Sequence, residues 1–300
     1  MLQDQSATQP FSIQPISDVL GGEIVGFDVR DLAPGAQIEA LRETLRDKQV
    51  LVFRDQDLTP AELTDFVRLI GDPQYSVLKQ WQLPGRPEID VLSNVVEDGR
   101  AIGNAYTGLN WHSDLLSNEA RRTYYTVLYG LEVPEVGGGT NFASMYQAYE
   151  ALPEARQREL DGMRMIYSYE RLYNSRRESL TSLGVDHGYK PLTDEQLTVA
   201  QRRQINPIVD TDPRSGRKWL HLATGGCVGV EGMPDEEGVK LVRGIIDYAT
   251  SPRFRYDHAW RVRDLVIWDN HGLFHVAADY DRTKQRRLLH RCSIAPRLAQ

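Results

Sequence analysis

One stretch near the carboxyl end, residues 266–293, constrains the fold more than any other part of the chain. It begins with the apolar run VIW at 266–268, which is typical of a buried strand. The turn-prone Asp-Asn pair that follows marks the end of this strand. His275 comes directly after the turn, and residues 287–294 then alternate charged with apolar side chains. Such alternation is typical of a strand with one face on a cavity. The stretch therefore predicts two strands that carry a histidine and charged side chains to one site.

Arg287 and Arg291 lie four residues apart in the second of these strands. Two side chains at that spacing point to the same face of a strand, so both can reach one anionic ligand. The other residues of such a site must come from earlier in the chain.

The composition is that of an ordinary globular protein. The 300 residues suffice for one large domain or two small ones, with 41% hydrophobic and 26% charged residues. A formal net charge of −7 disfavours nucleic-acid and anionic-membrane partners. The two cysteines, Cys227 and Cys292, lack paired spacing and fit reduced thiols in a cytosolic enzyme. Because no apolar run reaches about eighteen residues and the N-terminus resembles no signal peptide, we expect a soluble, cytoplasmic protein.

Short periodic segments outline the rest of the fold. We expect a loose tail over residues 1–10 and a single domain over 11–300. Helical spacing and capping residues predict helices at 38–45, 59–70, 144–152 and 235–250, and one that begins with a capping box at Thr193 and Gln196. Apolar and β-branched runs predict strands at 48–55, 89–92 and 121–133, and a hairpin over 206–223.

Two irregular segments, 72–110 and 164–190, are expected to form long loops and a lid or insertion. Because long loops in compact domains are often functional, Lys79 and Tyr106 are candidate substrate contacts. Ordinary surface cover is the commoner role for such residues. In the same way, His221 on a predicted strand is more often a packed histidine than a site residue.

The segment NWHSD at 110–114 carries a candidate metal-binding pair. On extended chain, the imidazole of His112 and the carboxylate of Asp114 project to one side, so both can bind one ion. The pair alone means little, because His-x-Asp arises often by coincidence. Two histidines and one carboxylate on one face of an octahedral metal are the ligand set of non-heme Fe(II) oxygenases, which keep three positions open. His275 is the candidate third ligand.

Six ordered blocks resemble the taurine dioxygenase/2,4-dichlorophenoxyacetate dioxygenase family over roughly residues 11–297. They are WHSD, GGGT with the FASMYQAYEALP that follows it, HLATGGCVGVEGMP, VIWDN, His275 and QRRLLHR. The resemblance implies a mainly β fold with flanking helices and a double-stranded β-helix (jelly-roll) core. It also implies an Fe(II)- and 2-oxoglutarate-dependent dioxygenase that uses O₂ to hydroxylate, and in some cases then cleave, a small anionic substrate, releasing succinate and CO₂.

Carried across residue by residue, the resemblance makes His112, Asp114 and His275 the iron ligands. It makes Thr140, at the mouth of the three-glycine turn, and Arg287 the partners of the distal carboxylate of 2-oxoglutarate. A guanidinium suits this role because its planar fork can bind a carboxylate through two hydrogen bonds. From the residues alone, a turn threonine more often bonds its own turn.

The resemblance places Arg291 nearer the iron, where it can hold either the proximal carboxylate of the co-substrate or an acidic group of the substrate. Trp268 and Asn270 resemble supporting residues of the family. The chain departs from the family pattern at Gly139, where Asp is common, and at His271, where Arg is common. We expect the first to loosen the co-substrate loop, and the second to support the site or lie at the surface.

Several alternatives remain open at this point. The same iron centre can desaturate, epoxidise or cyclise a biosynthetic intermediate, and two histidines with a carboxylate can also hold zinc in a hydrolase or a non-oxidative metal-binding protein. The third alternative is a family member without catalytic activity that acts within an assembly. Arg287 and Thr140 argue against a hydrolase, and Asp114 argues against a halogenase, which needs that position for a halide. The resemblance implies a homo-oligomer, dimer or tetramer, and leaves the substrate's identity open.

Overall fold

The computed structural model describes residues 10–76, 78–115, 123–182, 191–193, 197 and 203–297. Nearly all of the expected tail over residues 1–10, and Gln196 of the capping box predicted at Thr193, lie outside the described residues.

A large sheet forms the base of the structure. Its strands follow the order β1-β2-β3-β17-β9-β19-β6-β5, with β4 paired to β19, and all pairs are antiparallel except β2 with β3. The bounds are β1 Ser12–Pro15, β2 Gly22–Val25, β3 Val50–Phe53, β4 Asp72–Gln74, β5 Gln82–Leu83, β6 Arg86–Ser93, β9 Tyr125–Glu132, β17 Leu265–Asp269 and β19 Leu288–Ala295.

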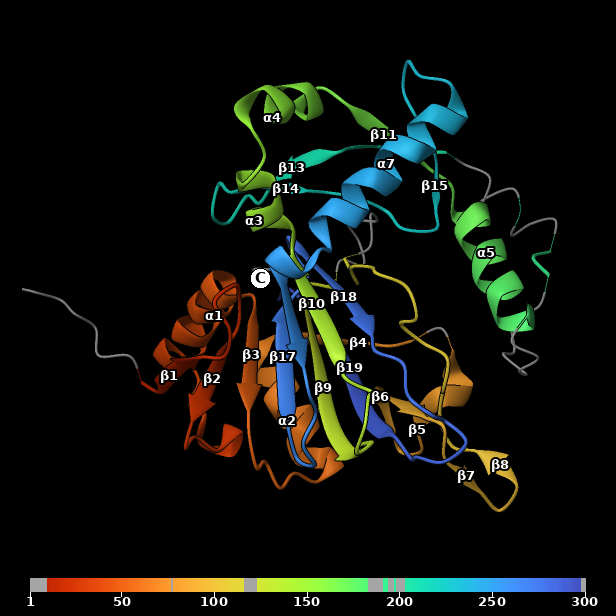
Figure 1. Cartoon of the computed structure of the whole chain (residues 1–300). Helices are drawn as coiled ribbons and strands as arrows, with labels where there is room; N and C mark the ends of the chain where they lie inside the picture. The colour runs from red at the N-terminus through yellow and green to blue at the C-terminus, as the bar shows by residue number, and fades with distance from the viewer. Residues whose placement is uncertain are drawn as a thin grey trace, which may run out of the picture.

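A smaller antiparallel sheet packs against one face of the large sheet. It consists of β16 (Arg255–His258), β10 (Thr140–Ser144) and β18 (Leu273–Ala277). A buried cluster joins the two sheets, with Leu128 and Trp268 from the large one against Phe142 and Leu273 from the small one. This is the jelly-roll core that the resemblance implies, in a mainly β protein with flanking helices (Figure 1).

Helices α1 (Ala36–Lys48) and α2 (Pro60–Ile70) cover the outer face of the large sheet. Thr59 begins α2 with the predicted capping box, since its side chain accepts from the Glu62 N–H and the Glu62 carboxylate accepts from the Thr59 N–H. The apolar positions of α2 at 63, 66, 67 and 70 are buried against the sheet. The helix therefore forms where its cap and its apolar stripe predict it.

A second helical layer lies above the sheets in Figure 1 and has its own apolar core. It contains α3 Met145–Glu150, α4 Glu154–Asp161, α7 Asp235–Ala249, the hairpin β13 Val209–Thr211 with β14 Lys218–Leu220, and the sheet β12 Gln204–Pro207, β11 Arg164–Tyr167 and β15 Cys227–Val230. Helix α5 (Tyr169–Ser182) packs beside β15. The remaining short elements are η1 Val29–Asp31, η2 Lys79–Trp81, η4 Pro252–Phe254, β7 Val96–Glu97 and β8 Arg100–Ala101.

The expectation that segments 72–110 and 164–190 are irregular is wrong for the residues described. Residues 72–110 contain five strands rather than one, and residues 164–182 form β11 and α5, while 183–190 lie outside the described residues. The lid or insertion over 164–190 stays a prediction. Strand β6 is the predicted one, but it is longer than the apolar run at 89–92. Its acidic residues break the apolar pattern and are paired in the fold. Glu88 meets Arg68 at 2.5 Å and Asp90 meets Arg291 at 2.8 Å.

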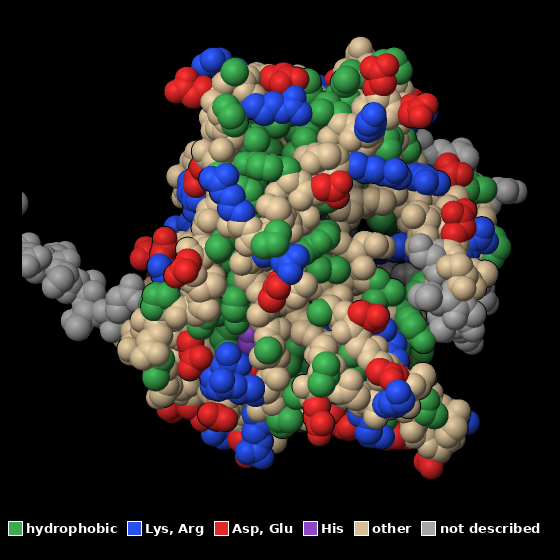
Figure 2. All heavy atoms as spheres, viewed as in Figure 1, with side chains coloured by type: hydrophobic (Ala, Val, Ile, Leu, Met, Phe, Trp, Pro, Cys, Tyr) green, Lys and Arg blue, Asp and Glu red, His purple; other side chains and the backbone are tan. Residues whose placement is uncertain are grey.

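None of the helices in the described residues combines the length and the apolar character needed to cross a bilayer. Basic and acidic side chains are interspersed over the face drawn in Figure 2.

A tight turn between β17 and β18 sets the position of His275. Gly272 has a φ of +60°, in the left-handed region that favours glycine. Its carbonyl accepts from the Gln49 side chain at 2.7 Å and from the Met145 N–H at 2.8 Å. A Cβ at this position would collide with the ring of Tyr146. The turn therefore requires glycine for both its backbone and its packing.

Replacing Gly272 with alanine should lower the free energy of unfolding by more than the same change at Gly232. Gly232 also has a positive φ, +77°, but open space surrounds its Cβ position. Both variants incur the left-handed backbone cost of about 1–2 kcal/mol. Only Gly272→Ala adds the collision with Tyr146, at about 1–3 kcal/mol. Urea unfolding measures both, and equal losses would contradict a role for the Tyr146 contact.

Candidate active site

His112 and His275 are joined through their backbones. The His112 N–H donates to the His275 carbonyl at 3.0 Å, and the His275 N–H donates to the His112 carbonyl at 2.8 Å. This isolated bridge adds the segment around His112 to the edge of β18, beside the smaller sheet. The two rings consequently lie with their centroids 4.2 Å apart.

Asp114 completes the cluster predicted from the sequence. Its Oδ1 lies 3.7 Å from His112 Nε2, and its Oδ2 lies 3.6 Å from His275 Nε2. One ligand atom from each of the three residues lies within 4.8 Å of the others. Ligand bonds of about 2.0–2.2 Å allow one divalent ion to reach all three atoms. Two imidazoles and a carboxylate are a donor set that fits Fe(II).

The protonation states of the cluster also suit a cation. Burial lowers the pKa of His275 to about 3 and lowers that of His112, so both imidazoles are neutral at pH 7. Burial alone would raise the pKa of Asp114, but the adjacent imidazoles, Arg291 and the Thr126 hydroxyl bring it down to about 2. Neutral histidines beside an ionised carboxylate are the forms in which these side chains bind metals.

The tautomer of His112 is set by its neighbour. Its Nδ1 lies 2.7 Å from the Asn110 carbonyl, which can only accept, so Nδ1 carries the proton and Nε2 keeps a lone pair. His112 Nε2 and His275 Nε2 are the atoms that face Asp114. The lone pair of His112 is thus directed at the centre of the cluster.

Thr140 and Arg287 meet at the three-glycine turn. Arg287 Nε donates to the Gly138 carbonyl at 2.9 Å, and Thr140 follows two residues later, at the start of β10. The Thr140 Oγ1 accepts from Trp260 Nε1 at 3.1 Å, which leaves its own O–H to donate elsewhere. Both side chains are buried.

Arg287 is a buried cation with no acidic partner within the described part of the chain. Burial lowers the pKa of its guanidinium to about 10. A buried charge without a counter-ion is costly, so the position favours an anionic ligand.

Two backbone hydrogen bonds connect the glycine turn to the segment after β18. The Gly138 N–H donates to the Asp279 carbonyl, and the Ala278 N–H donates to the Gly139 carbonyl, each at 3.0 Å. A Cβ on Gly139 would lie 2.5 Å from the His258 carbonyl oxygen. Glycine at 139 therefore permits a close backbone approach, and a loosened loop relative to the family stays a prediction.

Arg291 lies opposite Asp90 in the pairing of β19 with β6 and donates to its Oδ2 at 2.8 Å. Its charge acts on His112, Asp114 and His275, whereas Arg287 is not among the charges that shift their pKa values. Arg291 is thus the nearer of the two arginines to the cluster. Sequence reasoning missed Asp90, whose one signal was an acid inside the apolar run IDVL.

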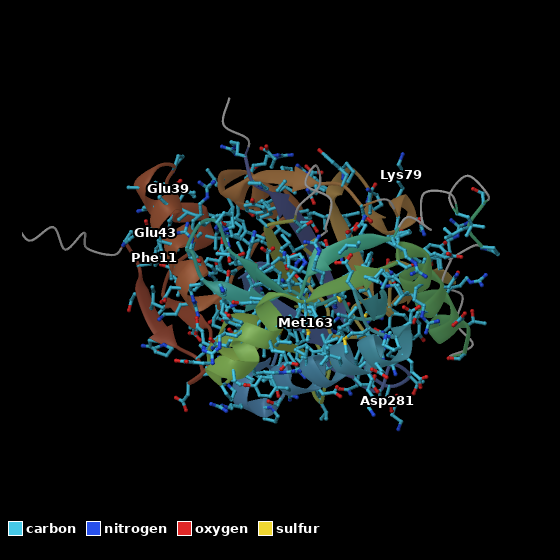
Figure 3. All side chains as sticks on the ribbon, turned by 90° about the horizontal axis from the view of Figure 1, so that it is seen from above. Phe11, Glu39, Glu43, Lys79, Met163 and Asp281 are labelled. Carbon is cyan, nitrogen blue, oxygen red and sulfur yellow. The ribbon has the colours of Figure 1, made fainter. Side chains whose placement is uncertain are left out.

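The two candidate substrate residues separate in the structure. Lys79 is exposed on η2, at the outer edge of the molecule (Figure 3). Tyr106 is partly buried, and the Arg282 guanidinium carbon lies over its ring, 5.4 Å from the ring centroid. Two residues later, a Cβ on Gly108 would lie 3.6 Å from the His112 ring. The loop of Tyr106 therefore reaches the cluster, whereas the role of Lys79 stays a prediction.

His271 is buried, so the surface position that we allowed for it is wrong. Its Nδ1 lies 3.0 Å from Asp269 Oδ1, and its ring meets Tyr124 edge to face at 4.5 Å. Arg214 from the β13–β14 turn pairs with the other oxygen of Asp269 at 2.8 Å. His271 therefore belongs to a buried charge network beneath the β17–β18 turn.

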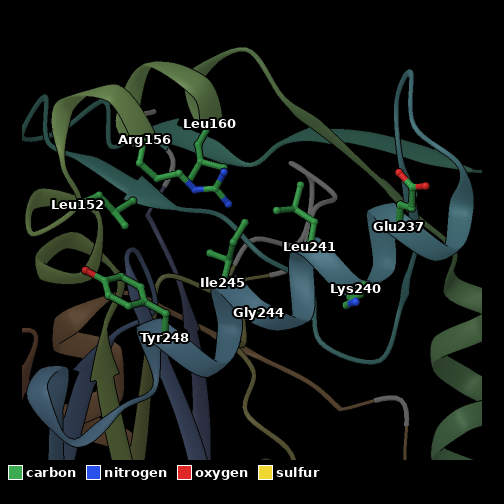
Figure 4. Close-up of a pocket in the computed structure, with 9 residues that line it drawn as sticks. All are labelled: Leu152, Arg156, Leu160, Glu237, Lys240, Leu241, Gly244, Ile245 and Tyr248. Atoms are coloured by element: carbon green, nitrogen blue, oxygen red, sulfur yellow. The ribbon is translucent and has the colours of Figure 1, made fainter.

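An open apolar groove of about 550 Å³ lies elsewhere, between α4 and α7 (Figure 4). Leu160, Leu241 and Ile245 line it, and its lining contains none of the predicted site residues.

Comparison with known proteins identifies the class. Residues 12–293 match the family described as "Taurine catabolism dioxygenase TauD, TfdA family". The chain belongs to this family. As a TauD/TfdA-family protein it is an Fe(II)- and 2-oxoglutarate-dependent dioxygenase, an oxidoreductase that uses O₂. Membership confirms the resemblance seen in the sequence and favours the oxygenase over the zinc hydrolase.

Individual relatives of this TauD/TfdA-family chain extend over nearly its whole length. It is 32% identical to the alpha-ketoglutarate-dependent 2,4-dichlorophenoxyacetate dioxygenase of Cupriavidus pinatubonensis, over 91% of this chain and 94% of the relative. It is 29% identical to a pentalenolactone F synthase of Streptomyces arenae, over 89% of each chain. A solved structure of AAD-2 with Mn(II) and N-oxalylglycine superposes with a TM-score of 0.74 at 26% identity, covering 95% of this chain and 97% of that one.

Proposed function

We propose that the protein hydroxylates a small anionic organic molecule at a metal centre held by His112, Asp114 and His275. The observation that carries this proposal is the convergence of three ligand atoms within 4.8 Å, from segments more than 150 residues apart in the chain. When bound, Fe(II) with 2-oxoglutarate and O₂ supplies the oxidising chemistry, and the co-substrate leaves as succinate and CO₂.

The chain's own residues bind and orient the reactants. The three ligands would occupy one face of the metal and leave the opposite positions for exchangeable molecules. Arg287 and the free O–H of Thr140 would bind the distal carboxylate of 2-oxoglutarate, because both are buried at one turn and Arg287 has no acidic partner among the described residues. The solved AAD-2 structure contains N-oxalylglycine, which is also a dicarboxylate.

The proposed substrate class rests on charge and on relatives. Arg291 would face the reacting end of the site, where an acidic group of the substrate or the proximal carboxylate of the co-substrate can accept from it. The Cupriavidus pinatubonensis relative is named for 2,4-dichlorophenoxyacetate, which carries a carboxylate. The loop of Tyr106 offers an aromatic wall beside the cluster.

We also propose a homo-oligomer in the cytoplasm that does not bind nucleic acid. The net charge of −7 and the mixed surface charges support the last point. Cys227 and the buried Cys292 are free thiols, as a reducing compartment favours.

The first test is substrate-stimulated succinate formation. The protein, loaded with Fe(II) without oxygen, receives 2-oxoglutarate, air and a panel of aryloxy acids, sulfonates, sulfate esters and amino acids. We expect one acidic class to stimulate succinate, and His112→Ala to abolish it because a metal ligand is lost. His221→Ala is the matched control and should retain activity. Full activity in His112→Ala would contradict the ligand assignment.

Arg287→Ala should raise the KM for 2-oxoglutarate by about 10- to 100-fold, because a charge-assisted hydrogen bond to a carboxylate is worth about 1.5–3 kcal/mol. Arg287→Lys should recover only part of this, since an ammonium does not reproduce the fork. Metal affinity, measured by titration, should stay near that of the wild type. An unchanged KM would show that another residue binds the carboxylate.

Arg291→Met distinguishes the two roles of this arginine. A rise in the KM for 2-oxoglutarate alone would assign it to the co-substrate, and a rise in the KM for the substrate alone would assign it to the substrate. We expect the latter, because Arg287 already offers an unpaired cation. Asp90→Asn should then lower the substrate KM, because it removes the carboxylate that competes for Arg291. No change in either KM would exclude Arg291 from binding.

A further inference from the structure

Three hydrogen bonds connect the interior of the large sheet to Asp114. Trp268 Nε1 donates to Asn270 Oδ1 at 2.9 Å, Asn270 Nδ2 donates to Thr126 Oγ1 at 2.9 Å, and Thr126 Oγ1 donates to Asp114 Oδ2 at 2.8 Å. We propose that this relay positions the Asp114 carboxylate for the metal, with Thr126 as the residue that acts on it directly. The inference rests on the proposed assignment of Asp114 as a ligand.

The relay can run in one direction only. An indole N–H is purely a donor, so Trp268 requires the oxygen of the Asn270 amide to face it. The amide nitrogen must then face Thr126 and donate to its hydroxyl oxygen. The single proton of that hydroxyl is left to point at Asp114. The orientation of each hydrogen bond is thus fixed by the preceding one, beginning with Trp268, whose indole N–H can only donate.

The three residues are held rigidly. Thr126 and Asn270 are 0% exposed and Trp268 is 1% exposed. Thr126 and Trp268 are direct cross-strand partners in the pairing of β9 with β17. The backbone of Asn270 is tied as well, because its N–H donates to the Tyr124 carbonyl at 2.8 Å and its carbonyl accepts from Ser113 Oγ at 2.9 Å. Because all three side chains are buried and hydrogen-bonded, the relay keeps its geometry.

The relay gives the carboxylate its own support in the large sheet, and its first residue, Trp268, also contacts the His275 ring, with 4.8 Å between the ring centroids. His112 and His275 are joined through the edge of the smaller sheet, whereas Asp114 is bonded to Thr126 in the large sheet. Bonding at Oδ2 restrains rotation of the carboxylate and directs Oδ1 toward His112. Groups that orient a metal ligand in this way typically change metal affinity by about 10- to 100-fold when they are removed.

The test compares two substitutions of Thr126. Thr126→Val keeps the shape and removes the hydroxyl, while Thr126→Ser keeps the hydroxyl. Anaerobic titration with Co(II), followed by visible absorption, measures metal affinity without turnover. We expect Thr126→Val to bind about 10- to 100-fold more weakly than wild type, and Thr126→Ser to stay within about threefold. Equal affinity of Thr126→Val and wild type, or of the two variants, would overturn the proposal.

Thr44→Val is the matched control for stability. Thr44 is a buried threonine in α1 whose hydroxyl donates to the Ala40 carbonyl at 2.8 Å and takes no part in the relay. It removes a buried threonine hydroxyl, as Thr126→Val does, and should leave Co(II) affinity unchanged. A comparable loss of affinity in Thr44→Val would show that general destabilisation explains the effect, and would overturn the relay.

Asn270→Asp tests the direction of the relay. A carboxylate at this position still accepts from Trp268 but cannot donate to Thr126, so the Thr126 proton is drawn away from Asp114. The added negative charge alone would strengthen cation binding. The relay predicts weaker Co(II) binding, and tighter binding would contradict it.

Asp114→Ala separates this inference from the proposed function. If Asp114→Ala loses Co(II) while Thr126→Val keeps wild-type affinity, the ligand assignment stands and the relay is overturned. If Asp114→Ala keeps wild-type affinity, the ligand assignment fails and the relay fails with it.

Discussion

The two backbone hydrogen bonds between His112 and His275 are the contact on which the site depends. They bring together segments that are 163 residues apart, and they place both imidazoles on one edge without help from either side chain. The relative position of the two histidines is therefore set by antiparallel backbone pairing, which is a property of the fold. Mutations in the site can alter its chemistry while this frame persists.

Around this frame, the two sheets contribute different parts. The smaller sheet carries His275 and Thr140, and the large sheet carries the strand of Arg291 and the support of Asp114. The cluster of apolar side chains between the sheets sets their separation. A close-packed core transmits small changes in shape, so substitutions in this layer should reach the site although they touch none of its residues.

Much of this could be predicted from the sequence, because the candidate ligands His112, Asp114 and His275 and the arginines sit in short motifs with their own chemical signature. The helices with clear caps, such as α2, were also predictable. Asp90 and Thr126 were not, because an aspartate or threonine within a strand has no local feature that reveals its partner. Asp90 meets Arg291 across 201 residues and Thr126 meets Asn270 across 144, and strand register is decided by the whole sheet. Helix α5 was missed because its apolar periodicity is weak. The helix packs on β15, a contact that its own sequence does not reveal.

The buried guanidinium of Arg287 has a consequence beyond catalysis. The folded chain keeps this charge in a poorly solvated place, whereas the unfolded chain exposes it to water. A dianion that paired with it would bind the native state alone, so its concentration would shift the folding equilibrium by RT ln(1 + [L]/Kd). The ligand that fills the site would then also stabilise the fold against unfolding.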